Sequence, residues 1–369
     1  MAQPRSLVVD PDRSGIYHCT SRCVRRERLL ASPDRREWIL RRLELLVQYL
    51  AVDVICFAIL PNHLHVLVRT LPERARSLSD RQVAVCRLSL LPNIRLRKQL
   101  GLSAEDPPCE AEIQSFLSNP LAVRRARQDL SSLGFFHKML KEPCARRWNL
   151  EDSVTGHFWE GRYRSPRVLD SEAVLRVARY IELNEIRACL ADSIPASLWS
   201  SVCAQWMRLW RAVHDAAQLS ADTLTEALSE LRWEPVLPCG IPEAPEHALG
   251  TSIPSMPLAA YLAEVDALGR VPRAGRPGFI RSTVVAFEEA IAGAAGQLAA
   301  GVRSLLHGGG STLARRWNEA GGLGPANRED PMCMRPCTGV GSCYGSRAAC
   351  RAEAVRRGVR NTVAIELSG

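Results

Sequence analysis

The segment between residues 52 and 68 limits the fold more than any other part of the chain, because it predicts two strands joined by a tight turn. Val52–Ile59 is apolar and β-branched, Pro61-Asn62 interrupts it, and His63–Val68 resumes an extended pattern. An alternating strand at Gly15–Arg22 and a helix that opens at Pro33-Asp34 precede this hairpin. The order strand, helix, strand, turn, strand predicts an α+β fold with an antiparallel sheet.

The rest of the chain divides into segments of different character. A stretch of helical period with basic patches, broken at Pro107-Pro108, predicts a helical insertion. A helix over 135–148, an extended segment over 158–168 and a helix over 171–190 then continue the core. The expected parts are the first half of the core at 1–70, the insertion at 71–133, the second half of the core at 134–200, and a mostly helical accessory extension with an irregular tail at 201–369.

His63 and His65 stand two residues apart on the second strand of the predicted hairpin. Because side chains alternate along a strand, both imidazoles project from one face while Leu64 and Val66 face the core. Two parallel imidazoles can bind one divalent cation and leave positions open for water and substrate. Two polar residues on a solvated sheet face are the alternative interpretation, and the pattern alone does not exclude it.

The helix predicted over 171–190 carries a second signal, with Ser171 as its expected N-cap. An apolar stripe of Val174, Val177, Ala178 and Ile181 docks it. Tyr180 and Asn184 place a nucleophile and a neutral oxygen ligand one turn apart on a neighbouring polar face. A core tyrosine followed by a helix-terminating asparagine is the alternative. That polar face is expected to hold Arg176, Tyr180, Asn184 and Arg187.

The two signals together describe phosphoryl-transfer chemistry. A phenol loses its proton around pKa 10, so it is a poor nucleophile near neutral pH. A metal that polarises the scissile phosphate lets a tyrosine attack in line, and the resulting phosphotyrosine conserves the bond energy for rejoining. Tyr163, which lies between Arg162 and Arg164, is the rival nucleophile, but no ligand-type residue accompanies it at helical spacing.

Ordered motifs over roughly residues 5–200 resemble those of one family. They are Pro61-Asn62-His63-Leu64-His65, Lys141-Glu142-Pro143, Thr155-Gly156, Phe158-Trp159-Glu160-Gly161-Arg162-Tyr163 with Ser165, and Tyr180-Ile181-Glu182-Leu183-Asn184 with Arg187-Ala188. The first is similar to the histidine–hydrophobic–histidine (HUH) motif. The set resembles the tyrosine HUH transposases of the smallest insertion sequences and the REP-associated, palindrome-linked transposases.

The resemblance implies an HUH core with a ferredoxin- or RRM-like antiparallel sheet. It also implies that His63 and His65 hold a Mg²⁺ or Mn²⁺ ion, with Asn184 as third ligand, and that Tyr180 forms a 5′-phosphotyrosine on single-stranded DNA. The implied activity is that of a DNA transposase, a monomer or homodimer that nicks and rejoins one strand at hairpin-forming element ends.

The chain departs from the family pattern at two motifs and in its length. Glu185 stands where proline usually follows the asparagine, which adds a charge near the expected metal, and Cys23-Val24 replaces Gly-Asn after the first strand. A domesticated or inactive relative that binds DNA palindromes without transposition is therefore the alternative function. A zinc-dependent hydrolase that uses the histidine pair is a third hypothesis, although no carboxylate or third histidine lies within residues 63–67.

The formal charge of +9 is carried almost wholly by arginine, because lysine occurs only at Lys98, Lys138 and Lys141. Arginine grips phosphate bidentately and stacks on bases, so a nucleic-acid partner fits this composition. A GC-rich genome favours the same composition, and the charge does not separate these explanations. The candidate phosphate contacts are Arg25, Arg26, Arg162, Arg164 and Arg176.

The remaining features indicate a cytoplasmic protein without membrane association. Thirteen scattered cysteines do not form a secreted disulfide frame, residues 1–11 are polar, and the hydrophobic stretch at 43–60 is interrupted by charge. The spacing of Cys333, Cys337, Cys343 and Cys350 is wider than the paired knuckles of zinc sites, so no metal role is assigned. We expect packing or surface roles for His18 and His157, a core role for Trp159 and a structural role for Tyr344.

Overall fold

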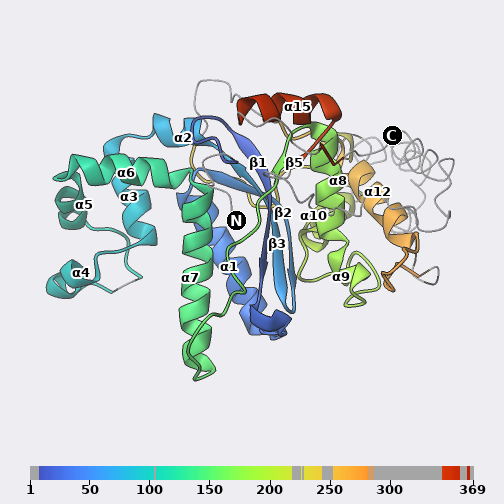
Figure 1. The fold of residues 1–369 in the computed structure, drawn as a ribbon, viewed down its shortest axis with the longest axis horizontal. Coiled ribbons are helices and arrows are strands. Elements are labelled where there is room, and N and C mark those ends of the chain that lie inside the picture. Colours follow the sequence, from blue (N-terminus) through green and yellow to red (C-terminus); the bar gives the residue numbers. More distant parts are fainter. Residues whose placement is uncertain are drawn as a thin grey trace.

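The computed structural model describes residues 8–103, 105–217, 226, 228–242, 252–281, 283, 285, 343–357 and 364–365. These residues form a mixed sheet with helices on both of its faces, as Figure 1 shows. The expected α+β class is therefore confirmed.

The strands within the described ranges are β1 (Gly15–Arg22), β2 (Val52–Leu60), β3 (His63–Thr70), β4 (Arg167–Val168), β5 (Cys343–Tyr344) and β6 (Ala364–Ile365). Their order across the sheet is β2-β3-β1-β4-β5-β6. The three long strands pair antiparallel, and β4 is antiparallel to β1. β5 runs parallel to β4, and β6 runs parallel to β5.

The predicted hairpin and the predicted first strand are confirmed as β2, β3 and β1. β2 is buried along its whole length because helices cover both faces, which explains its unbroken apolar sequence. In the register of β1 with β3, His63 lies opposite Arg22 and His65 lies opposite Thr20. The register therefore surrounds the histidine pair with polar side chains of β1.

Two helices, α1 (Pro33–Tyr49) and α7 (Leu133–Glu151), cover one face of the sheet. Leu64 and Val66 of β3 and Tyr17 of β1 pack into the core on this side. The expectation that Leu64 and Val66 face the core is thus confirmed. We call this side of the sheet the packed face.

The opposite face of the sheet is covered by α8 (Ser171–Glu182), α9 (Asn184–Arg187), α10 (Ser201–Ala217) and α12 (Leu258–Arg270). Ile16 of β1 and Leu67 of β3 belong to the core on this side. Because side chains alternate along a strand, His63 and His65 share the side of Leu67. We call this side the histidine face. The core on this side includes side chains of α10 and α12, so the region beyond residue 200 packs against the same sheet.

The helix expected over 171–190 differs from the prediction at both ends. Its N-cap is Asp170, not Ser171, because the Asp170 carboxylate accepts a hydrogen bond from the backbone N–H of Ala173 at 2.9 Å. The helix ends at Glu182, and a short helix, α9, begins at Asn184. The expected apolar stripe is confirmed, since its four residues are buried.

Buried polar contacts fix α8 against α12. The Tyr261 hydroxyl donates to the Glu182 carboxylate at 2.5 Å, and Arg179 forms an ion pair with Glu264. Burial raises the pKa of Glu182 to about 7, and the hydrogen bond from Tyr261 opposes that shift. These contacts fix α12 against the helix that carries Tyr180.

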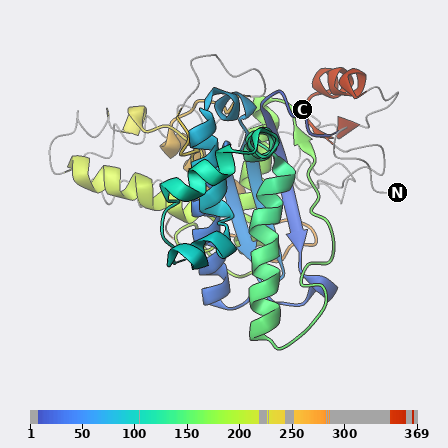
Figure 2. The ribbon, with the colours of Figure 1, turned by 90° about the vertical axis from the view of Figure 1, so that its left-hand side faces the viewer.

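The insertion lies away from the sheet beyond α7, and Figure 2 views the molecule from this side, with these helices in front of the sheet. Its helices are α2 (Pro72–Ser77), α3 (Asp80–Leu90), α4 (Ile94–Leu100), α5 (Glu110–Leu117) and α6 (Pro120–Leu130). Arg97 of its first basic patch is buried and forms two hydrogen bonds with Glu112. That arginine is structural and is not part of a phosphate-binding surface.

The segment 158–168, which contains β4, and the helix α15 (Arg347–Arg356), which follows β5, lie at the outer strands of the sheet. The segment 158–168, expected to be extended, pairs with β1 through a bridge at Arg164 and through β4, and Trp159 forms a bridge with Cys23 just after β1. The helix α15 lies near β5 and the upper end of α8 in Figure 1. No helix in the described ranges is long and apolar enough to cross a membrane.

Candidate functional site

A pocket of about 240 Å³ opens on the histidine face, where β3 begins and α8 meets α9. Four of its lining residues are those that the sequence predicted for the reaction centre: His63, His65, Tyr180 and Asn184. The other lining residues are Arg22, Arg26, Leu60, Asn62, Ala188 and Arg276. Strand alternation and the docking of α8 therefore bring the two sequence signals to one cavity.

His63 is oriented by its neighbour Asn62. Its Nδ1 lies 2.6 Å from the Asn62 carbonyl oxygen Oδ1, so Nδ1 carries the proton that it donates. The Asn62 amide nitrogen donates in turn to the carbonyl of Arg26 at 3.1 Å. Nε2 of His63 then bears the lone pair and has no hydrogen-bond partner in the described chain, so it is available to a ligand.

His65 is oriented by two residues of β1. Its Nδ1 lies 2.9 Å from Nε2 of His18 and 3.2 Å from the Thr20 hydroxyl. If Nδ1 of His65 donates to His18, Nε2 of His65 carries a lone pair, as metal ligation requires. The sequence favoured a packing or surface role for His18, and its contact with His65 places it beside the candidate site. The cross-strand diagonal between His18 and His65 was the signal that could have found it.

Tyr180 lies over the histidines and is partly exposed. Its ring centroid is 5.8 Å from that of His65 and 6.0 Å from that of His18, and it stands nearly perpendicular to both rings. The ring centroids of His63 and His65 are 4.9 Å apart. The phenol and both imidazoles therefore face a single small volume.

Asn184 is the first residue of α9, two residues after the end of α8, and it lines the same pocket. Its amide nitrogen donates to the carbonyls of Tyr180 at 2.8 Å and of Ile181 at 3.2 Å. This arrangement fits the helix-terminating role that the sequence left open. It also fixes the side chain so that Oδ1 is the atom left for a ligand. The two interpretations of Asn184 are compatible in this geometry.

The histidines are held neutral. Burial lowers the pKa of His63 to about 4, and the charges of Arg22 and Arg276 add to this effect. Burial, followed by the neighbouring His18, lowers the pKa of His65 well below its usual value. Burial alone lowers the pKa of His18 to about 4. At neutral pH no proton competes with a cation for the imidazole lone pairs.

The residues present fit a divalent cation with mixed ligands. Two neutral imidazoles and one amide oxygen leave open coordination positions for substrate and water. Imidazole is a softer ligand than Mg²⁺ prefers, so this set favours Mn²⁺ more than a cage of carboxylates would. Within the described part of the chain no cluster of three or more His, Cys, Asp or Glu residues is arranged to hold a metal. The proposed centre is a different kind of site, because one of its three ligands is an asparagine.

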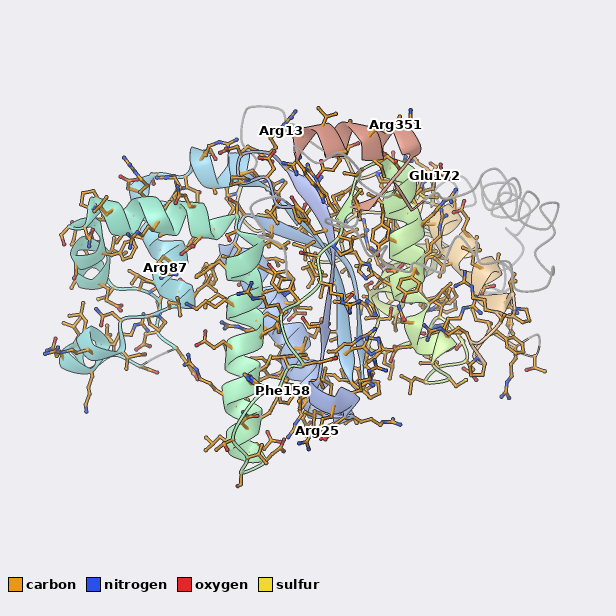
Figure 3. All side chains as sticks on the ribbon, viewed as in Figure 1. Arg13, Arg25, Arg87, Phe158, Glu172 and Arg351 are labelled. Carbon is orange, nitrogen blue, oxygen red and sulfur yellow. The ribbon has the colours of Figure 1, made fainter. Side chains whose placement is uncertain are left out.

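The predicted arginines are distributed unevenly around the pocket. Arg26 lines it, and Arg25 is exposed at the same lower end of the sheet in Figure 3. Arg164 is exposed opposite Thr20 of β1, and Arg162 is exposed close by. Arg176 forms an ion pair with Glu172, near the upper end of α8 and away from Arg25.

Arg187 of the expected polar helix face and the nearby Glu185 do not line the pocket. Arg187 is buried and donates to backbone carbonyls of residues 268, 271 and 278. Glu185 is also buried and accepts from the backbone N–H of Trp199 at 3.0 Å, and burial raises its pKa to about 7. Its carboxylate does not line the pocket. The break after Glu182 separates both residues from the face that carries Tyr180.

The rival tyrosine lies on the packed face. Tyr163 is 7% exposed and stacks on His137 with ring centroids 3.6 Å apart. Trp159 is buried there too and donates to the carbonyl of Lys141 at 3.1 Å, which confirms its core role. His157 is exposed, as one of its two expected roles requires. The sheet therefore separates Tyr163 from the histidine pair.

Cys343 and Tyr344 form β5, and Cys350 lies on α15. Tyr344 is buried in the core, with its ring centroid 6.1 Å from that of His18. The sulfur atoms of Cys343 and Cys350 lie 3.6 Å apart. Cys333 and Cys337 fall outside the described residues, as does the irregular tail apart from residues 343–357 and 364–365.

Comparison with known proteins adds no family to this geometry: neither a scan against protein-family models nor searches of curated proteins and of solved structures found a match.

Proposed function

We propose that this chain cleaves and rejoins single-stranded DNA through a covalent bond between Tyr180 and a 5′ phosphate, assisted by a divalent cation on His63 and His65. One observation carries the proposal: a single pocket is lined by both histidines, Tyr180 and Asn184. The motif resemblance supports it, because the same four residues hold the corresponding positions of the tyrosine HUH transposases. The antiparallel pairing of β1, β2 and β3 under α8 also supports it, because the resemblance implies an antiparallel sheet beneath the helix of the nucleophile.

The protein residues prepare the centre before substrate arrives. Asn62 holds Nδ1 of His63, while His18 and Thr20 hold Nδ1 of His65. Both Nε2 atoms then serve as ligands together with Oδ1 of Asn184. A bound Mg²⁺ or Mn²⁺ would polarise the scissile phosphate and offset the charge that develops on it.

The covalent step is a transesterification. The Tyr180 oxygen forms a bond to phosphorus while the bond from phosphorus to the 3′ oxygen of the preceding nucleotide breaks. The leaving oxygen gains a proton, the phenol loses one, and the products are a 5′-phosphotyrosine and a free 3′ hydroxyl. The number of phosphoester bonds is unchanged, so the reverse attack by another 3′ hydroxyl rejoins the strand without an energy source.

The pocket suits an unpaired strand better than a duplex. It is lined by His63 and His65 of β3, by Tyr180 of α8 and Asn184 of α9, and by Arg276. A phosphate must reach the floor of this small cavity, which a flexible single strand can do and a stiff paired backbone cannot. We therefore expect single-stranded or hairpin DNA as the substrate.

The test compares hairpin-forming oligonucleotides from the genomic flanks of the coding sequence with plain duplexes of the same sequence. In Mn²⁺ or Mg²⁺, denaturing gels should show a protein–DNA adduct with the hairpin and none with the duplex. Mass spectrometry should locate the adduct on the peptide that contains Tyr180. Tight hairpin binding without any adduct would instead favour the binding-only alternative.

A further inference from the structure

A segment from beyond the transposase-like core reaches into the pocket. Residues 271–281 follow α12, and Arg187 at the end of α9 holds them in place. The Arg187 guanidinium donates to the carbonyls of Leu268 at 2.6 Å, Val271 at 2.8 Å and Gly278 at 3.2 Å. Arg187 is 6% exposed, so these bonds are shielded from water and fix the segment against the core.

The backbone of the same segment also packs closely against the backbone of α9 at Gly278. A side-chain carbon on Gly278 would lie 1.7 Å from the carbonyl oxygen of Ile186, so only glycine fits there. The backbone N–H of Ile280 donates to the carbonyl of Gly269 at 2.9 Å. The segment therefore returns along α9 after a turn and does not lie loosely over it.

The turn between these anchors presents Arg276. The backbone N–H of Arg276 donates to the carbonyl of Arg273 at 3.1 Å, and Gly275 takes a positive φ of 70° between them. Arg276 is exposed, lines the pocket and has no acidic partner in the described part of the chain. It therefore shares the pocket with His63 and His65, and its positive charge lowers the pKa of both imidazoles.

The lining of the pocket carries positive charges that no acidic side chain of the described lining neutralises. Arg22, Arg26 and Arg276 line it, and its described lining contains no aspartate or glutamate. Three like charges around one small volume repel one another, and this cost is offset when an anion enters. Two of these arginines come from the end of β1 and η2 (Val24–Arg26), whereas Arg276 approaches from the α9 side.

We propose that Arg276 is a substrate-binding residue, supplied by the region beyond the core, that grips a backbone phosphate of the DNA strand opposite Arg22 and Arg26. This inference deepens the proposed function and rests on it for the identity of the anion. It assigns Arg276 and the turn of residues 273–276 to the active site. A guanidinium in this place holds phosphate bidentately and fixes the strand across the pocket.

The test measures binding apart from chemistry, in a Tyr180→Phe background that prevents covalent capture. Labelled oligothymidylate is titrated at several salt concentrations, and inorganic tripolyphosphate serves as an anion without bases. Arg276→Gln is compared with Arg281→Gln, a matched control five positions later whose side chain is exposed and does not line the pocket. Gly278→Ala displaces the segment without changing charge.

We expect Arg276→Gln to weaken oligonucleotide binding about tenfold, as the loss of one charged hydrogen-bonding group would. The slope of log affinity against log salt should become shallower by about 0.7, the value for one phosphate contact on a single strand. Tripolyphosphate binding should weaken in parallel. Gly278→Ala should shift both in the same direction, and Arg281→Gln should match the parent.

The outcomes separate this inference from the proposed function. If Arg276→Gln binds both probes as the Arg281→Gln control does, or if the parent binds neither probe, the inference is overturned. In the first case the Tyr180 adduct can still form and the proposed function stands. If Arg276→Gln loses anion binding but no protein ever forms an adduct, the anion site stands and the proposed function fails.

Discussion

The two faces of the central sheet hold similar residue types in different surroundings. On the packed face, Tyr163 stacks on His137 with ring centroids 3.6 Å apart. On the histidine face, Tyr180 stands nearly perpendicular to His65 at 5.8 Å. The first pair is closed in by α1, α7 and the segment 158–168. The second pair opens into a pocket lined by arginines.

The comparison indicates that a tyrosine beside a histidine is not enough to form a reaction centre. The pair must also be accessible to substrate and correctly oriented. A tyrosine and a histidine in close stacking, both below 8% exposure, can fill a core. Similar residues held apart, with ring nitrogens fixed by neighbours, leave room for a phosphate.

Tyr180→Phe should abolish the covalent adduct altogether, because it removes the one oxygen that attacks phosphorus. The fold should survive, since the ring and its packing remain. Tyr163→Phe, the matched change on the packed face, should leave adduct formation near that of the parent. Denaturing gels with a labelled hairpin oligonucleotide measure both. An adduct that persists in Tyr180→Phe and disappears in Tyr163→Phe would reverse the assignment of the two faces.

His63→Ala and His65→Ala should each lower the rate of Mn²⁺-dependent cleavage by about 10²- to 10³-fold, because one metal ligand is lost. Mn²⁺ should support at least as much activity as Mg²⁺, and EDTA should stop cleavage. His157→Ala is the control, since His157 is exposed and does not line the pocket. Single-turnover rates measure the effect. Undiminished cleavage in EDTA would remove the cation from the mechanism.

Leu64→Ala should cost about 3 kcal/mol of unfolding free energy, because Leu64 is 1% exposed on the packed face and its loss leaves a cavity. His63→Ala, at the neighbouring position but on the histidine face, should cost less than about 1 kcal/mol, because its ring lies in an open pocket. Urea denaturation measures both. Equal losses would mean that the histidine face is packed as a core.

Acid should weaken the fold through the buried histidines. The pKa of His18 falls from 6.5 to about 4 on folding, so the unfolded chain binds more protons between these values. The contribution of His18 to stability is therefore fully present above pH 6.5 and is lost as pH drops toward 4. His18 alone should cost about 2 kcal/mol between about pH 6.5 and pH 5.

His18→Gln cannot titrate, so its unfolding free energy should change less over this pH range than that of the parent. Thermal or urea unfolding at a series of pH values measures the difference. The same variant should also lose cleavage at neutral pH, because Nδ1 of His65 loses its partner. An unchanged pH dependence would show that His18 is not held neutral by burial.

The sequence predicted the sheet and the histidine face well, because strand alternation depends only on local pattern. It placed His63 and His65 together, with Leu64 and Val66 on the other side, and the structure agrees. It failed where contacts join distant segments. The roles of His18 and Arg276 depend on strand register and on a turn far along the chain. Neither can be inferred from spacing within one motif.

The helix that carries Tyr180 shows the same limit on a smaller scale. Its apolar stripe was predicted, but its end at Glu182 depends on the Asn184 side chain, which bonds the Tyr180 carbonyl. Arg187 then turns toward residues 268–278 because their carbonyls offer it partners. Tertiary contacts thus overrode a helical periodicity that continues in the sequence through residue 190.

The outer strands of the sheet impose an order on folding. β2, β3 and β1 all lie within the first 70 residues and can pair soon after they leave the ribosome. β4, which has only two residues, has its outer neighbour at Cys343–Tyr344. Closing so long a loop is slow, and until it closes the nascent sheet keeps an exposed edge that other chains can pair with. Synthesis rate and chaperone supply should therefore govern the yield of this protein more than the stability of the finished sheet does.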